Sequence, residues 1–235
     1  MELDAGLVCQ EVDFGWPTET AVHPPILKKI DVAFPPGTVN LISGATGAGK
    51  STLLHLLAGL LRPTAGAVWA GGQPVSRWPA DHRDRWRQQV GIVFQHLALV
   101  PDLSVAENLM MPLLPRGLTW SAMQAAIGQQ LEASEMTDLA TVPAGTLSGG
   151  QRQRAAIARA LVTGPRYLLA DEPTAFQDDR QAGRIADRLA HAARHGAVVV
   201  VCSHDPRLRQ SSVVHHRFQL ARGRLEKTIG PQVGP

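Results

Sequence analysis

The stretch Gly44-Ala45-Thr46-Gly47-Ala48-Gly49-Lys50-Ser51 is the part of this sequence that decides its fold. It comes directly after an apolar run at Val39 to Ile42 and opens a segment, Lys50 to Leu61, that is apolar nearly all round. The glycines allow a tight backbone turn whose N–H groups point at an anion from a helix N-terminus. Strand, loop and helix in this order predict a phosphate-binding loop of the G-x-x-x-x-G-K-[ST] pattern.

Two side chains of this loop carry chemistry of their own. Lys50 places a positive charge beside the terminal phosphates of a nucleotide, and the Ser51 hydroxyl is a ligand for Mg²⁺. Thr52 follows at once, so we count it with residues 44–51 among the nucleotide-binding residues. We therefore expect the chain to bind ATP together with Mg²⁺ and to hydrolyse it.

Further apolar runs rich in β-branched residues predict a sheet around this loop, because runs that do not alternate with polar residues read as strands buried on both faces. They lie at Val39 to Ile42, Val90 to Phe94, Tyr167 to Ala170 and Val198 to Cys202. Helix-like segments lie between them, one at Gln151 to Val162 and one after Asp178 and Asp179. Alternating strands and helices indicate an α/β fold.

The segment from about His96 to Thr146 breaks this alternation. It contains prolines and helix-compatible stretches such as Ser121 to Met136, but no strong strand. We interpret it as an inserted helical subdomain.

Two carboxylates, Asp171 and Glu172, follow the strand Tyr167 to Ala170, at the edge where ligands collect in doubly wound sheets. Asp171 is a candidate to hold Mg²⁺ through water. Glu172 is the candidate to orient and polarise an attacking water, because phosphoryl transfer depends on positioning and charge stabilisation.

A second anion-binding end is predicted at Leu147-Ser148-Gly149-Gly150-Gln151, which opens a helix. Ser148 and the glycine N–H groups are placed to face a phosphate at this helix N-terminus. Two phosphate-recognition ends in one chain are more than a single nucleotide needs.

The phosphate loop, the Leu147 to Gln151 signature and the Asp171, Glu172 strand end together resemble the ATPase subunit of ATP-binding-cassette (ABC) proteins over essentially the whole chain. This resemblance implies a P-loop NTPase with a RecA-like core sheet, an N-terminal antiparallel β subdomain and an inserted α-helical subdomain. It implies a single ABC ATPase domain over residues 1–235. Residues 1–95 and 165–235 would form the β subdomain and core, and residues from about 96 to 164 the helical subdomain with the signature.

The resemblance also implies roles for residues that would be unremarkable alone. Gln95 matches the glutamine that contacts Mg²⁺ and senses the γ-phosphate, and His204 matches the switch histidine. Trp16 is the best match for the aromatic residue that stacks on adenine, with Phe14 as the alternative. Asp178 matches the aspartate that ends the loop after Glu172, whereas Phe176 and Gln177 depart from the usual pattern before it.

As partners, the family implies a second copy of the chain, paired head to tail so that the phosphate loop of one copy and Ser148 of the other enclose each ATP. It also implies an integral membrane permease. The run from Phe94 to Leu114 resembles the lipoprotein-releasing and macrolide-exporter branch, in which this region receives short permease helices. Leu109, Met110 and Met111 are candidates for that lining, with ordinary core packing as the alternative.

Two other functions of such an ATPase are compatible with the sequence. One is a non-transporting ABC ATPase that acts in repair or translation, although such members carry a long coiled coil or a second cassette that this chain lacks. The other is a regulatory subunit that resembles the cell-division ATPase of the same branch and moves no substrate.

The charge and cysteine content limit the partners and bonds that we expect. The formal net charge of +3 is too small and too dispersed to argue for nucleic acid, so we expect none. We interpret two arginine rows, Arg83, Arg85, Arg87 and Arg180, Arg184, Arg188, as solvated helix faces without function. Cys9 and Cys202 are expected to be buried and unpaired.

The amino terminus has no basic segment followed by an apolar one, so we expect no secretory signal. Prolines and glycines interrupt the longest uncharged segment, residues 32–49, so we expect no membrane-spanning helix there. We therefore expect a cytoplasmic protein, and the permease that the family resemblance implies would place it at the inner face of the cell membrane.

Overall fold

A six-stranded sheet forms the centre of the protein. The structure is a computed structural model, and it describes residues 6–16 and 25–228. The strand order of the sheet is β5-β6-β7-β3-β8-β9. The strands are β3 Val39–Ser43, β5 Val90–Val93, β6 Tyr167–Asp171, β7 Val198–Cys202, β8 His216–Ala221 and β9 Arg224–Thr228. All neighbours are parallel except β8 and β9. The four predicted strands are thus confirmed, and their carboxyl ends meet at one edge of the sheet.

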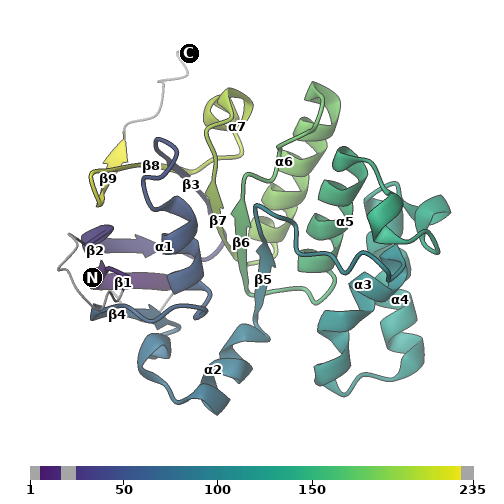
Figure 1. Ribbon diagram of the computed structural model, residues 1–235, viewed down its shortest axis with the longest axis horizontal. Coiled ribbons are helices and arrows are strands. Elements are labelled where there is room, and N and C mark those ends of the chain that lie inside the picture. Colours follow the sequence, from purple (N-terminus) through teal and green to yellow (C-terminus); the bar gives the residue numbers. More distant parts are fainter. Residues whose placement is uncertain (1–5, 17–24, 229–235) are drawn as a thin grey trace.

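A smaller antiparallel sheet of order β2-β1-β4 packs beside the first one (Figure 1). Its strands are β1 Leu7–Phe14, β2 Leu27–Phe34 and β4 Ala65–Ala70. The β1–β2 register shifts between Cys9 and Phe14, and Glu11 and Lys29 adopt positive φ there. These bulges break the regular alternation of buried and exposed side chains that would mark the strands in the sequence.

Helix α1 (Lys50–Leu57) fills the space between the two sheets, and its leucines belong to the larger of the apolar cores. It ends earlier than the predicted Leu61 because Gly59 adopts φ 69° and the amide of Leu60 turns back to the carbonyl of His55. The turn η1 (Val75–Arg77) and helix α2 (Ala80–Arg87) follow β4, and their Val75 and Trp86 belong to the same core.

A second core lies on the other face of the large sheet, under α6 (Asp179–Arg194) and α7 (Pro206–Gln210). A third core belongs to the helical segment, whose elements are α3 Val105–Met110, η2 Met111–Arg116, α4 Trp120–Ala133, η3 Thr137–Leu139, η4 Ala144–Thr146 and α5 Gly149–Leu161. Helix α5 joins the last two cores, because Ala155 and Ala158 face the helical segment while Ala156 and Ile157 face the sheet.

Leu109 lies in the third core with no exposed surface. It therefore packs in the core, as the alternative interpretation expected, and does not line a docking groove. Met110 is partly buried against the same core. Met111 is the one of the three that reaches solvent, with 42% of its surface exposed.

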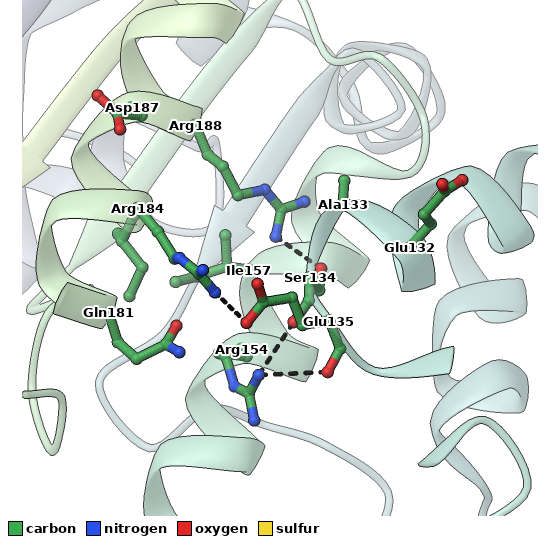
Figure 2. Close-up of a pocket in the computed structure, with 11 residues that line it drawn as sticks. Glu132, Ala133, Ser134, Glu135, Arg154, Ile157, Gln181, Arg184, Asp187 and Arg188 are labelled. Carbon is green, nitrogen blue, oxygen red and sulfur yellow. Dashed lines mark hydrogen bonds and ion pairs between the residues drawn. The ribbon is translucent and has the colours of Figure 1, made fainter. Parts of the chain in front are cut away.

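The prediction that the arginines of α6 form a solvated row is wrong for Arg188. Its guanidinium turns toward the end of α4 and donates to the Ser134 hydroxyl at 2.7 Å (Figure 2). It also donates to the Gln130 side chain at 2.5 Å. Burial lowers the pKa of Arg188 to about 10. Arg184 pairs with Glu135 in the same pocket, whereas Arg180 is exposed.

Both cysteines are free and buried, as expected. Within residues 6–16 and 25–228, none of the helices is long and apolar enough to span a bilayer.

Candidate active site

The loop between β3 and α1 has the geometry of a phosphate cradle. Gly49 caps α1 with φ 101°, and a Cβ atom at Gly44 would lie 2.4 Å from the carbonyl oxygen of Leu220. Only glycine fits these two positions. The Lys50 ammonium donates to the carbonyl oxygens of Gly44 and Ala45 at 2.8 and 3.0 Å, which keeps its charge inside the loop. The remaining predicted members, Thr46, Gly47, Ala48 and Thr52, complete the loop and the first turn of α1.

The predicted metal ligands Ser51 and Asp171 meet across the sheet edge. The Ser51 hydroxyl donates to Oδ2 of Asp171 at 2.5 Å. Burial raises the pKa of Asp171, an effect that the Ser51 hydrogen bond opposes and the neighbouring Glu172 charge reinforces. A buried carboxylate beside a hydroxyl suits a hard cation such as Mg²⁺, which prefers oxygen ligands. Among the described residues, no group of three or more His, Cys, Asp and Glu side chains forms a metal site by itself.

Glu172 is held by the two residues that follow the neighbouring strand β7, Ser203 and His204. Its carboxylate accepts from the Ser203 hydroxyl at 2.7 Å, from the His204 backbone N–H at 3.2 Å, and contacts the His204 ring nitrogen Nδ1 at 2.6 Å. Its backbone has φ 48°, a strained value for glutamate that is common at functional sites. Glu172 and His204, predicted separately, thus form a pair, and Ser203 is a partner that the sequence analysis did not identify.

Gln95 is exposed in the turn after β5. The turn is fixed from α5, because Arg159 donates to the carbonyl oxygens of Leu97 and Ala98 at 2.8 and 2.6 Å. Both of these residues have positive φ, and burial lowers the pKa of Arg159. The sequence does not indicate this role of Arg159, because Arg159 and Ala98 are 61 residues apart.

The signature begins α5 at Ser148, which is exposed. The Ser148 hydroxyl accepts from the Gln151 backbone N–H at 3.3 Å, and the Gln151 side chain accepts from the Ser148 N–H at 2.8 Å. This capping box fixes the first turn of α5, which contains Gly149 and Gly150. Both glycines are half-buried. In Figure 1, β3, β7 and β6 stand between α1 and α5. The two predicted phosphate-binding ends therefore lie apart within one chain.

The loop from Pro173 to Asp178 links Glu172 to α6. Thr174 donates to the Asp205 carboxylate at 2.5 Å, and Arg207 bonds Asp205 and the carbonyl oxygen of Gln177. Asp178 caps α6 by accepting from the Gln181 N–H at 2.8 Å. The residues after His204 therefore position the loop after Glu172, a connection that their separation in sequence does not reveal.

The two candidates for adenine stacking differ in exposure. Phe14 is 4% exposed and belongs to the main core, whereas Trp16 is 55% exposed and packs edge-on against Phe14. Only Trp16 of these two presents a free aromatic face.

Known proteins resemble this chain in sequence and in fold. A protein-family model described as ABC transporter matches residues 27–175. The lipoprotein-releasing system ATP-binding protein LolD 1 of Caulobacter vibrioides is 38% identical over 207 residues, covering 87% of this chain and 88% of that protein.

Among solved structures, the dimeric ATP-binding cassette MJ0796, in a post-hydrolysis state with ADP and Pi, matches with a TM-score of 0.87 and 28% identity over 95% of this chain and 99% of that one. CbiO1 from Clostridium perfringens, part of the ABC transporter complex cbiONQ, matches with a TM-score of 0.80 and 26% identity over 95% of this chain and 87% of that one. The expected fold class is thereby confirmed.

Proposed function

Because this chain belongs to the ABC transporter family and is one of its ATP-binding, ATP-hydrolysing subunits, we propose that two copies pair head to tail and drive a membrane permease. The separation of Ser148 from the phosphate loop of its own chain carries this proposal, since each end would complete a site only in a second copy (Figure 1). The dimeric state of the MJ0796 cassette supports it.

In the proposed site, the Gly44 to Ser51 loop and Lys50 bind the ATP phosphates, and Trp16 stacks on the adenine. The N–H groups of Gly149 and Gly150, with the Ser148 hydroxyl and Gln151, approach from the second copy. Ser51, Asp171 and Gln95 would hold Mg²⁺, which supplies positive charge beside the phosphate oxygens.

Glu172 is the proposed catalytic residue that orients the attacking water and draws its proton. The water oxygen bonds to the γ-phosphorus while the bond to the β–γ bridging oxygen breaks, leaving ADP and inorganic phosphate. The hydrogen bonds from Ser203 and His204 keep the carboxylate in place for this step.

A groove of about 520 Å³ between β5 and the helical segment is the proposed docking site for the permease. Phe94, Met111 and Pro115 give it an apolar lining, and Arg87 and Asp84 stand in the same wall. Such a lining suits the apolar face of a short amphipathic helix. The permease would hold the chain at the inner face of the cell membrane.

The name of the LolD relative supports export or release of a lipoprotein or similar lipid-linked substrate. A regulatory role, in which ATP hydrolysis signals through the membrane partner without moving a substrate, is the second candidate.

Affinity purification of this chain from native membranes tests the proposed permease partner. We expect an integral membrane protein to copurify, and Met111→Glu to abolish its recovery by placing a charge in the groove. Leu60→Glu is the matched control, because Leu60 is 44% exposed, Met111 is 42% exposed, and Leu60 does not line the groove. Recovery of ribosomes or DNA in place of a membrane protein would overturn the proposal.

A further inference from the structure

Phe176 combines two unfavourable properties. It is the most exposed large apolar side chain in residues 6–16 and 25–228, at 78%, and its backbone has φ 60°, a value that phenylalanine rarely adopts. It lies in the loop that leads from the proposed catalytic Glu172 to α6. Strain of this kind persists where surrounding contacts enforce it, and it points to a function.

The loop is packed onto the signature of the same chain. A Cβ atom at Gly149 would lie 3.7 Å from Cβ and Cγ of Phe176, and one at Gly150 would lie 3.2 Å from the Phe176 carbonyl oxygen. The Gln177 side chain donates to the Gly150 carbonyl oxygen at 3.0 Å. The phenyl group of Phe176 therefore stands beside the first turn of α5, next to Ser148.

The opposite side of the loop is anchored as well. Arg207 donates to the carbonyl oxygen of Gln177 at 3.0 Å and to that of Thr174 at 3.4 Å. Bonds on both sides hold Phe176 in its exposed position, so the ring is presented to solvent by a fixed loop.

We propose that Phe176 is an aromatic contact for a second copy of this chain and becomes buried when ATP draws two copies together. The inference rests on the proposed head-to-tail pairing, which brings the Ser148 end of α5 against another copy; a ring beside Gly149 then lies at that interface. The two-fold symmetry of such a pair places two rings in each dimer. Phe176 adds apolar contact beside the polar groups of Ser148 and Gln151 at that end of α5.

The first test measures dimer dissociation by sedimentation at saturating ATP, in a Glu172→Gln background that limits turnover. Removing one buried phenyl group weakens association about tenfold, so Phe176→Ala should raise the Kd of a dimer with two rings about a hundredfold. Phe176→Leu should recover part of this loss. Trp120→Ala is the matched control, because Trp120 is an aromatic residue with 62% exposure at the start of α4, and it should leave the Kd unchanged.

The second test measures burial of position 176 directly. Burial raises the pKa of the Cys9 thiol to about 12 and that of Cys202 well above its usual value, so both native thiols react slowly. In the Glu172→Gln background, alkylation of the thiol introduced by Phe176→Cys should slow at least about tenfold when ATP is added.

The outcomes separate the two proposals. If the Glu172→Gln protein stays monomeric with ATP, the head-to-tail pairing fails and this inference fails with it. If that protein dimerises while Phe176→Ala leaves the Kd unchanged and ATP leaves the alkylation rate unchanged, only the role of Phe176 is overturned.

Discussion

Arg188→Met should change the stability of the protein much less than the loss of a buried ionic group suggests. Arg188 donates two hydrogen bonds, to Ser134 and Gln130, which join α6 to the end of α4. Hydrogen bonds of a charged group contribute about 1.5–3 kcal/mol each, or about 3–6 kcal/mol for the two. Dehydration of the guanidinium opposes them.

The cost of dehydration follows from the pKa of Arg188, which burial lowers from 12.5 to about 10. This difference corresponds to about 3 kcal/mol against the charged form in the folded protein. Below the folded pKa the guanidinium is charged in both states, so the cost is present in full at neutral pH and is lost only as the pH rises toward 12.5. Arg188→Met removes both contributions and keeps most of the apolar stem, which leaves an expected loss of about 0–3 kcal/mol in the free energy of unfolding.

Urea unfolding at neutral pH measures the effect. Arg188→Ala should cost about 2 kcal/mol more than Arg188→Met, because it also removes the packing of the methylene stem. Arg180→Met, on the exposed side of the same helix, should stay within about 0.5 kcal/mol of the parent protein. A loss above about 5 kcal/mol for Arg188→Met would refute the reasoning, since dehydration would then not offset the hydrogen bonds.

Three further predictions concern the candidate site. Glu172→Gln should lower the ATPase rate about 10²–10⁴-fold while ATP still binds, whereas Glu226→Gln on exposed β9 should not; near-normal turnover would remove Glu172 from catalysis. Asp171→Asn should abolish Mg²⁺-dependent ATP binding yet raise stability without nucleotide at neutral pH. Burial raises the Asp171 pKa and disfavours its ionised form, so this gain should shrink as the pH falls toward 3.8, and a pH-independent difference would contradict it. Trp16→Ala should weaken ATP binding by about 1–3 kcal/mol in isothermal titration without affecting tripolyphosphate binding, and equal losses for both ligands would argue against adenine stacking.

The sequence predicted the parts of the fold that rest on local patterns. The four buried parallel strands are continuous apolar runs, and the phosphate loop follows the G-x-x-x-x-G-K-[ST] pattern between a strand and a helix. The contact with Leu220 that requires glycine at Gly44 appears only in the structure. The antiparallel strands β1 and β2 could be expected only from the family resemblance. Their bulges at Glu11 and Lys29 break the period on which sequence reasoning depends.

Such local patterns do not predict contacts between segments that are distant in the sequence. Arg188 belongs to a row of arginines at helical spacing, but the end of α4 covers it and the solvated interpretation fails. Leu109 matched a docking surface by its position, yet it fills the core of the helical segment. The bonds from Ser203 to Glu172 and from Arg159 to the turn after Gln95 depend on which elements are neighbours in space.

The most direct test of the shared site is complementation between two inactive variants. Lys50→Ala should inactivate the phosphate loop and Ser148→Arg the signature, so each protein alone should lack ATPase activity. In an equal mixture, half of the dimers combine one copy of each variant and contain one intact site, which restores up to about a quarter of the parent activity if the sites work independently. Recovery of activity on mixing is the result we predict. Full activity of Ser148→Arg alone, or no recovery in mixtures shown to contain the mixed dimer, would contradict a site shared between two copies.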